Sequence, residues 1–368
     1  MSMGFGDMQM KILHVGEYMQ GGLATYAKIL FSADGDKGIE NYMILSDYNS
    51  EHNWPLSADR IKYYSYKRSI GSIIPAMRII HQHINDLQPD VIYCHSTWAG
   101  VLGRFPYLFC RKNVRIIYNA HGWSFNMDTS LWKKQIYAFV ERMLARVTDK
   151  IINVSKYEMN SAVAMGLPEA KMVMIYSGIS SEKPVIKKKV KMPADKVNLL
   201  FVGRFDPQKG VDFLLKVFHE YEKDLQHIHL WIIGDNVVSD GKGIEKKNSD
   251  NITFLGWIPH EEVPAYYEAC DAVIMPSRWE AFGLVAIEAM KYGKPVIVSN
   301  RGALPELVQD GVNGWVFNMD DSHSLLSRLK QLRRKNTLEG EKIKSYFQKN
   351  FILEKMLKDI FRLKEMKV

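Results

Sequence analysis

Short apolar runs rich in β-branched residues alternate along this chain with longer segments in which apolar residues recur at helical spacing. The short runs predict buried strands, and the longer segments predict helices. Helices are expected after Gly22, Ser72, Trp98, Ser130 and Ser155. The predicted strands of the first half are Met10–Val15, Asn41–Ser46, Val91–His95, Arg115–Ala120, Ile151–Val154 and Val173–Tyr176. This order predicts βαβ units around a parallel sheet.

The same pattern begins again at Val197, after a lysine-rich segment with two prolines over residues 183–196. That segment predicts a linker between two domains. The strands predicted after it are Asn198–Val202, His229–Ile233, Ile252–Leu255, Ala272–Met275, Pro295–Val298 and Gly314–Phe317. We therefore expect an α/β protein with two facing Rossmann-like domains, residues 10–182 and 197–345. The active site is expected in the cleft between them, where the carboxyl ends of parallel strands meet.

The two ends of the chain add little to this scheme. Residues 337–366 predict two more helices, of which the last, about 350–366, is basic and amphipathic and is expected to pack back on the first domain. Residues 1–9 lack the charged and apolar regions of a secretory signal, and we leave them out of the fold prediction. Because the chain has no run of eighteen apolar residues, no membrane-spanning helix is expected.

Composition agrees with two globular domains. The 368 residues are 46% hydrophobic, which is enough for two sizeable cores. The three cysteines are an odd number without a CxxC spacing, as is typical of a protein in the reducing cytosol. We therefore expect a cytoplasmic protein.

The net charge of +8 is unevenly distributed. Residues 1–180 carry 19 Lys and Arg against 15 Asp and Glu, whereas residues 197–334 carry 15 against 19. A basic first half indicates a face that meets something anionic, such as a membrane surface, a lipid-phosphate acceptor or nucleic acid. The chain has no aromatic-rich basic motif of a known nucleic-acid binder, so nucleic acid is not expected as a partner.

The most informative segment runs from Pro276 to Met290. Gly283 should open a helix directly after a strand and a loop, so that the amides of Phe282, Gly283 and Leu284 can bind a phosphate. Glu288 follows in a helix that is otherwise apolar, where a carboxylate needs a partner. A ribose diol would be a suitable partner. The alternatives are an ion pair with Lys291 or exposure on a narrow polar stripe.

A second loop between a strand and a helix, Gly203–Gly210, carries two cations. Arg204 and Lys209 lie beside glycines where backbone can approach a ligand closely. With helix-end amides, they could stabilise a departing nucleoside diphosphate without a metal. The alternative is an ordinary solvated loop.

Two weaker motifs lie in the first half. Gly21 and Gly22 follow the first strand and precede a helix, which suits close approach of a phosphate or sugar, although the GxGxxG fingerprint is absent. His121 follows the strand that ends near Ala120 and is either catalytic or structural. His95 ends another strand and is a weaker candidate of the same kind.

No metal or cofactor is expected. Asp34-Gly-Asp36 has the form of a metal-binding DxD motif, but it follows a helical stretch instead of a strand, so it predicts a helix-ending turn. No Cys or His spacing typical of zinc sites occurs in the chain.

Taken in order, these motifs resemble family-four retaining glycosyltransferases of the GT-B fold, the group 1 glycosyl transferases. The matching elements are Gly21-Gly22, His121-Gly122, Gly203-Arg204 with Lys209-Gly210, and Glu280 with Glu288 eight residues later. Turns at Gly256–Pro259 and Gly311–Gly314 match as well. The resemblance extends over residues 10–365.

The resemblance implies a role for each matching position. Arg204 and Lys209 would bind the diphosphate, and Glu288 would hold the ribose. Glu280, with the Phe282 and Gly283 amides and the adjoining Leu284, would bind the donor sugar and its phosphate. The remaining contacts would come from His121 at the reaction centre, from Gly21, Gly22 and Gly203 near the phosphates, and from Trp257 and Ile258 at the base.

The implied activity is metal-independent transfer of a hexose from a nucleoside-diphosphate sugar, with UDP- and GDP-sugars as the expected donors. The acceptor would be a glycan or a lipid-linked glycan in the synthesis of capsule, O-antigen or exopolysaccharide. Two alternatives share the fold: a nucleotide-sugar epimerase or phosphorylase, and a non-catalytic protein that binds nucleotide-sugars.

The segment Leu131–Val147 combines aromatic and aliphatic residues at helical spacing with Lys133, Lys134, Arg142 and Arg146. Such a helix suits an anionic membrane surface. Alternatively, it packs on its own sheet with a solvated basic edge. The first alternative would place the protein peripherally on the inner face of the plasma membrane.

Overall fold

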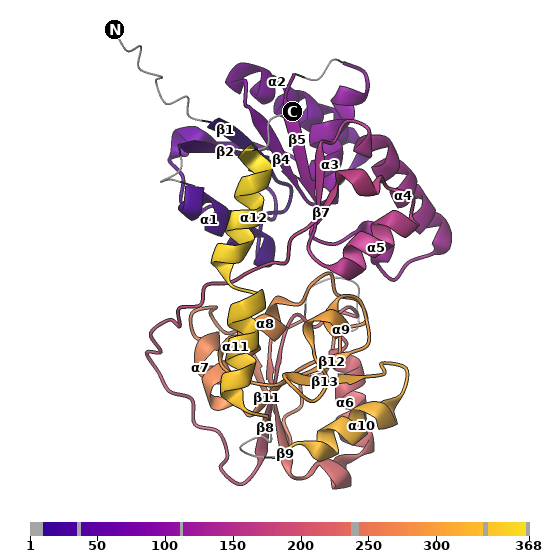
Figure 1. Cartoon of the computed structure of the whole chain (residues 1–368). Coiled ribbons are helices and arrows are strands. Elements are labelled where there is room, and N and C mark those ends of the chain that lie inside the picture. Colours follow the sequence, from indigo (N-terminus) through magenta and orange to yellow (C-terminus); the bar gives the residue numbers. More distant parts are fainter. Residues whose placement is uncertain (1–9, 35–37, 111–112, 237–242, 334–337, 366–368) are drawn as a thin grey trace. The chain divides into compact units, whose positions relative to one another are not determined.

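The computed structural model describes residues 10–34, 38–110, 113–236, 243–333 and 338–365. The chain divides into two compact units, Met1–Tyr176 with Leu357–Val368, and Ser177–Met356. Each unit contains one parallel sheet flanked by helices (Figure 1). Residues 1–9 and the last two residues of the Asp34-Gly-Asp36 motif lie outside the described residues.

The first unit has a seven-stranded parallel sheet in the order β3-β2-β1-β4-β5-β6-β7. The order reverses between β1 and β4, which are neighbours in the sheet. Its strands are β1 (Met10–Val15), β2 (Ile39–Ser46), β3 (Ile61–Tyr64), β4 (Val91–His95), β5 (Arg115–Asn119), β6 (Lys150–Asn153) and β7 (Met172–Met174). Its helices are α1 (Gly22–Asp34), α2 (Ile70–Leu87), α3 (Thr97–Arg104), α4 (Leu131–Ala145) and α5 (Lys156–Ala164).

The second unit has a six-stranded parallel sheet in the order β10-β9-β8-β11-β12-β13, with its reversal between β8 and β11. Its strands are β8 (Val197–Val202), β9 (Ile228–Ile233), β10 (Ile252–Gly256), β11 (Ala272–Met275), β12 (Val296–Ser299) and β13 (Gly314–Phe317). Its helices are α6 (Val211–Glu220), α7 (Val263–Ala269), α8 (Leu284–Lys291), α9 (Leu304–Leu307), α10 (Ser322–Gln331) and α11 (Gly340–Asn350).

The last helix, α12 (Leu353–Glu365), begins in the second unit and continues in the first. At its start, Ile179 donates a backbone hydrogen bond to Phe351, and Leu353 donates one to Ile179. The two stretches through which the chain passes from one unit to the other are therefore paired with each other.

Burial explains why the strands appear in the sequence as continuous apolar runs. Every residue of β4, β5, β11 and β12 is buried. A parallel sheet covered by helices on both faces requires apolar side chains at successive positions, because neither face meets water.

The structure confirms the prediction of two α/β units with parallel sheets, and the predicted strands recur within one or two residues. The sequence prediction missed β3, a short edge strand in which only Tyr64 is buried. It also began the last helix at residue 350, where α11 in fact ends. No helix in the described part of the chain is both long and apolar enough to cross a bilayer.

Candidate active site

The loops after β8 and β11 lie where the strand order of the second sheet reverses. In open parallel sheets, ligands bind outside the carboxyl ends of the strands at this reversal, because the loops on either side diverge there. Residues 203–210 and 276–283 form these two loops. The topology therefore brings the two most informative sequence segments together.

Backbone contacts fix the two loops against each other. The Arg278 amide donates to the Gln208 carbonyl over 2.8 Å. Gly210 has a φ of +67°, and a Cβ there would lie 1.9 Å from the carbonyl oxygen of Pro276. Only glycine combines the left-handed conformation with this close approach. Main-chain contacts thus contribute to the relative position of the loops.

Lys209 and Glu280 form an ion pair between the two loops. The ammonium lies 2.6 Å from Oε2 of the carboxylate, and the side chains are 20% and 13% exposed. A partly buried pair of this kind holds both groups in one orientation, because separating them would leave a charge poorly solvated. The pair places a cation and a carboxylate at the reversal point of the sheet.

Arg204 lies in the same loop as Lys209 but is far more exposed. Its guanidinium pairs with Asp206 at 3.0 Å, and its side chain is 52% exposed. Exposed pairs contribute little to stability, at most about 1 kcal/mol. An anionic ligand can therefore compete for this guanidinium at low cost.

Glu288 accepts a hydrogen bond from a tyrosine of helix α7. The buried Tyr267 hydroxyl of α7 donates to Oε2 over 2.7 Å. Burial raises the pKa of Tyr267 well above 10, and the nearby Glu288 adds to this effect. No described residue hydrogen-bonds to the other oxygen of Glu288, and no ion pair joins it to Lys291 in the described chain. One carboxylate oxygen thus remains available to a ligand.

Helix α8 begins directly after Gly283, which has a φ of +113°. No side chain of the described residues caps this helix at Gly283, and the first amides of a helix have no acceptor within the helix itself. A Cβ on Gly283 would lie 2.9 Å from Leu304, while Phe282 is buried and Leu284 half-buried. The helix that the sequence predicts to open at Gly283 is present in the second unit.

The loop after β10 presents Trp257 at the same edge of this sheet. The Trp257 side chain is 62% exposed, and Ile258 is half-buried. Gly234 donates a backbone hydrogen bond to Gly256, and a Cβ on Gly234 would lie 1.8 Å from the Gly203 carbonyl oxygen. The loops after β8, β9 and β10 are therefore held in sequence by main-chain contacts.

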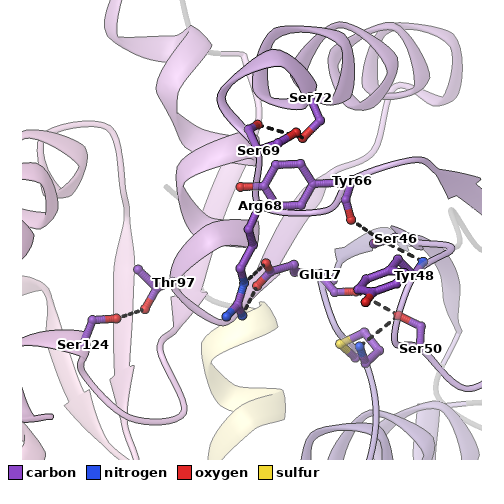
Figure 2. A network of polar contacts seen from close by, with 12 residues as sticks. Glu17, Ser46, Tyr48, Ser50, Tyr66, Arg68, Ser69, Ser72, Thr97 and Ser124 are labelled. Atoms are coloured by element: carbon purple, nitrogen blue, oxygen red, sulfur yellow. Dashed lines mark hydrogen bonds and ion pairs between the residues drawn. The ribbon is translucent and has the colours of Figure 1, made fainter. Parts of the chain in front are cut away.

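In the first unit, the loop after β1 contains the buried Glu17 and leads to Gly21 and Gly22. Gly21 has a φ of +60°, and a Cβ there would meet no atom within 4 Å. Gly22 is the first residue of α1. The buried Glu17 of this loop accepts two hydrogen bonds from Arg68, at 2.6 and 3.0 Å (Figure 2). The Arg68 guanidinium also lies 4.4 Å from the centre of the Tyr18 ring.

His121 lies just after β5 in a strained conformation. It has a φ of +54°, which is uncommon for a residue other than glycine, and its amide donates to the Asn119 side chain over 2.9 Å. Its ring meets the Tyr26 ring edge to face, with centroids 4.7 Å apart. Burial lowers the pKa of His121 to about 3, so the ring is neutral near pH 7.

Comparison with known proteins shows the family to which the chain belongs. Residues 20–183 match the model of glycosyltransferase family 4, and residues 182–350 match that of glycosyl transferases group 1. A protein of the cps region of Klebsiella pneumoniae, itself uncharacterised, is 35% identical over 86% of this chain and 88% of its own length. The chain belongs to the group 1 glycosyl transferases.

Solved structures agree with a GT-B glycosyltransferase fold. Sucrose-phosphate synthase from Thermosynechococcus elongatus has a TM-score of 0.76 at 21% identity, over 96% of this chain and 98% of its own. HepE from Anabaena, in complex with UDP, has a TM-score of 0.74 at 19% identity, over 97% and 100%. The recognition of a GT-B group 1 glycosyl transferase from the sequence motifs is confirmed.

Sequence reasoning missed several polar residues of this glycosyltransferase. Glu17 and Arg68 come from loops 51 positions apart, and Tyr267 lies 21 positions before Glu288. His14 and Asn41, inside predicted strands, were also not singled out. The sequence feature that could have indicated Glu17 is its position: it is a charged residue in the loop that follows the first strand. The other partners depend on which elements become neighbours in space.

Proposed function

We propose that the chain is a retaining, metal-independent hexosyltransferase that uses a nucleoside-diphosphate sugar. The observation that carries this proposal is the Lys209–Glu280 pair, 2.6 Å apart at the reversal of the second sheet. The ammonium can neutralise a diphosphate, while the carboxylate can accept hydrogen bonds from sugar hydroxyls. Because the two charges are paired, the carboxylate repels the diphosphate less than it would alone.

We assign the other donor contacts to the residues that the family resemblance singled out. Arg204 and the first amides of α8, at Phe282, Gly283 and Leu284, would share the phosphate charge with Lys209. The open oxygen of Glu288 would accept hydrogen bonds from the ribose. Trp257 and Ile258 would contact the base, where an exposed indole offers a stacking surface. In the first unit, Gly21, Gly22 and His121 would approach the phosphate and the sugar.

The proposed reaction needs no protein base. The acceptor oxygen bonds to the anomeric carbon on the face from which the diphosphate departs. The bond from that carbon to the phosphate oxygen breaks, and the leaving oxygen takes the acceptor proton. While that bond breaks, negative charge grows on the diphosphate in the transition state. Preorganised donors at such a position typically contribute several kcal/mol each, roughly 3–4 in well-studied sites.

Two relatives suggest the pathway and the acceptor. The Klebsiella pneumoniae relative belongs to a cps region. An Escherichia coli relative that is 26% identical over 65% of this chain is a UDP-Gal:α-D-GlcNAc-diphosphoundecaprenol α-1,3-galactosyltransferase. We therefore propose that this chain extends a lipid-linked glycan in surface polysaccharide synthesis, in the cytoplasm. The UDP bound by HepE supports a UDP-sugar over a GDP-sugar as donor.

Helix α4 supports a peripheral membrane position. Trp132, Ile136 and Phe139 lie on one side of the helix and are 62%, 50% and 55% exposed. Leu131, at the start of the helix, is 79% exposed, and Lys133 beside it is exposed too. Aromatic and aliphatic side chains flanked by lysines suit an anionic leaflet, in which the apolar groups enter the lipid and the ammonium groups meet phosphates. We propose that α4 binds the inner face of the plasma membrane.

The decisive test is acceptor-dependent release of nucleoside diphosphate. The purified protein is incubated with UDP-glucose, UDP-galactose or a GDP-hexose, each with and without a diphosphoundecaprenol-linked sugar. We expect release only when a suitable acceptor is present, and a product whose anomeric configuration, read by NMR, equals that of the donor. Conversion of the nucleotide-sugar without an acceptor would support an epimerase instead. Binding without any turnover would support a non-catalytic protein.

A further inference from the structure

Three histidines from neighbouring strands form a row across the first sheet. His14 lies in β1, His95 ends β4 and His121 follows β5. Nδ1 of His14 lies 2.9 Å from Nε2 of His95, and Nδ1 of His95 lies 3.2 Å from Nε2 of His121. The ring planes differ by only 11° and 24°. Each pair of facing nitrogens therefore shares one proton in an edge-to-edge hydrogen bond.

The row ends at an asparagine on β2. Oδ1 of Asn41 lies 2.9 Å from Nε2 of His14, and Asn41 is buried. His14 and His95 have no exposed surface at all. Charged imidazoles are costly in such surroundings, so both rings are neutral and each carries a single N–H. In the described part of the chain, no group of three or more His, Cys, Asp or Glu residues could hold a metal ion.

These conditions fix the direction of every hydrogen bond in the row. The amide oxygen of Asn41 can only accept, so His14 must donate from Nε2. The Nδ1 atom of His14 then has no proton and must accept from Nε2–H of His95. By the same logic, Nδ1 of His95 accepts from Nε2–H of His121. His121 is consequently left with a lone pair on Nδ1, to which no described residue donates a hydrogen bond.

We propose that Asn41, His14 and His95 are positioning residues that hold His121 as its Nε2–H tautomer and orient Nδ1 as a hydrogen-bond acceptor for a hydroxyl of the donor sugar. This inference rests on the proposed transferase function for its substrate, but not for the tautomer itself. The strained backbone of His121 and its edge-to-face contact with Tyr26 add to the same orientation.

The tautomer has a consequence for specificity. A lone pair attracts a group with a proton to donate and repels a carboxylate or an ether oxygen. The sugar group that meets His121 should therefore be a hydroxyl or an amide N–H. A donor in which that hydroxyl is replaced by hydrogen, or oxidised to a carboxylate, should be transferred more slowly by about tenfold or more, as is typical when a hydrogen bond of a binding site is left unmade.

Nuclear magnetic resonance can read the tautomer without any substrate. In ¹⁵N-histidine-labelled protein, two-bond ¹H–¹⁵N correlations distinguish Nε2–H from Nδ1–H and from the charged ring. We expect neutral Nε2–H rings for His14, His95 and His121 at pH 7. An Nδ1–H pattern for His121, which would follow if Asn41 presented its amino group to His14, overturns the proposal, and so does a charged His121.

Two substitutions of Asn41 form a matched pair. Asn41→Asp keeps an acceptor at the end of the row and should preserve the tautomers and most of kcat. Asn41→Leu has a similar size but no acceptor, so His121 should show a mixture of tautomers. Its kcat should fall about tenfold, whereas its Kd for the nucleoside diphosphate should stay within about twofold. Unchanged tautomers in Asn41→Leu overturn the proposal.

The transferase proposal and this inference fail in different ways. Nε2–H tautomers in a protein that transfers no sugar would leave the row intact and reject the function. Acceptor-dependent transfer by a protein with Nδ1–H on His121 would support the transferase function and overturn the proposed tautomer. If Asn41→Leu does not fold, the spectrum of the unmodified protein and its rate on a deoxy-sugar donor still decide the matter.

Discussion

The ammonium of Lys209 lies 2.6 Å from the carboxylate of Glu280, and this contact joins the loops that follow β8 and β11. The two residues are 71 positions apart in the chain, yet both follow neighbouring strands of one sheet. A proposed cation for the diphosphate and a proposed acceptor for sugar hydroxyls are therefore one structural unit, and a change in either residue affects the other.

Substitution Lys209→Ala should lower kcat/KM about 10²–10³-fold, as loss of a preorganised donor to a leaving group does. It should also weaken binding of the nucleoside diphosphate, because an unpaired Glu280 then repels the phosphates. The double variant Lys209→Ala/Glu280→Gln should recover part of the binding. Steady-state kinetics and calorimetry measure both effects.

Lys216→Ala is the matched control, since Lys216 is an exposed lysine on α6 of the same unit. It should behave like the unmodified protein. Equal turnover by Lys209→Ala and Lys216→Ala would reject the role of Lys209 in the reaction.

Substitution Glu288→Leu should weaken binding of UDP about tenfold if the open oxygen of Glu288 holds the ribose, because a charge-assisted hydrogen bond contributes roughly 1.5–3 kcal/mol. The loss should be absent for 2′,3′-dideoxy-UDP, which has no ribose diol. Tyr267→Phe is the control. It removes the hydroxyl that donates a hydrogen bond to Glu288 but keeps the carboxylate, so this variant should still bind UDP more tightly than 2′,3′-dideoxy-UDP. Equal losses of affinity for both nucleotides would show that Glu288 does not bind the ribose diol.

Burial lowers the pKa of His121 to about 3, whereas a histidine in the unfolded chain titrates near 6.5. The unfolded state therefore binds more protons between these two values, and the free energy of unfolding should decrease as the pH falls through this window. The slope from this one group is at most about 1.4 kcal/mol per pH unit.

Chemical denaturation of the unmodified protein and of His121→Gln at pH 7, 6 and 5 measures this effect. The unmodified protein should lose more stability between pH 6 and pH 5 than the variant does. Parallel curves for the two proteins would show that His121 titrates normally in the folded state. Catalysis between pH 6 and 8 should show no ionisation of His121.

The proposed membrane position of α4 predicts that Ile136→Ser/Phe139→Ser lowers binding to vesicles of anionic lipid at least tenfold, because two exposed apolar side chains are removed from the proposed lipid contact. Ile74→Ser is the control, since Ile74 is 60% exposed on α2 of the same unit. High salt should weaken binding as well, through Lys133 and Lys134. Equal binding by both variants would place the lipid contact outside α4.

The sheets could be predicted because each buried strand appears in the sequence as an uninterrupted apolar run. The edge strand Ile61–Tyr64 lacks such a run, since only Tyr64 is buried, and it escaped prediction for that reason. The loops after the strands were also predictable, because glycines and cations directly follow apolar runs at Gly203–Gly210 and before Gly283.

The partners of the site residues could not be predicted in the same way. Tyr267 as the partner of Glu288, and the row from Asn41 to His121, depend on which strands and helices become neighbours. A single sequence shows that His14 lies in an apolar strand but does not show which polar atoms the strand order places beside it. Polar residues inside strand-like apolar runs are the sequence feature that indicates such contacts.

The carbonyl oxygen of Pro276 that faces Gly210 has a practical meaning for redesign of this enzyme. Main-chain contacts help to set the spacing of the two loops, so Trp279 and Ala281, whose side chains form no hydrogen bond or ion pair among the described residues, can be exchanged in search of a new sugar preference. Arg278 and Glu280 are less free, because their side chains bond to the facing loop. Gly210 itself offers no such freedom: with 1.9 Å available to a Cβ, even alanine would push the loops apart and change what every other residue in the site can reach.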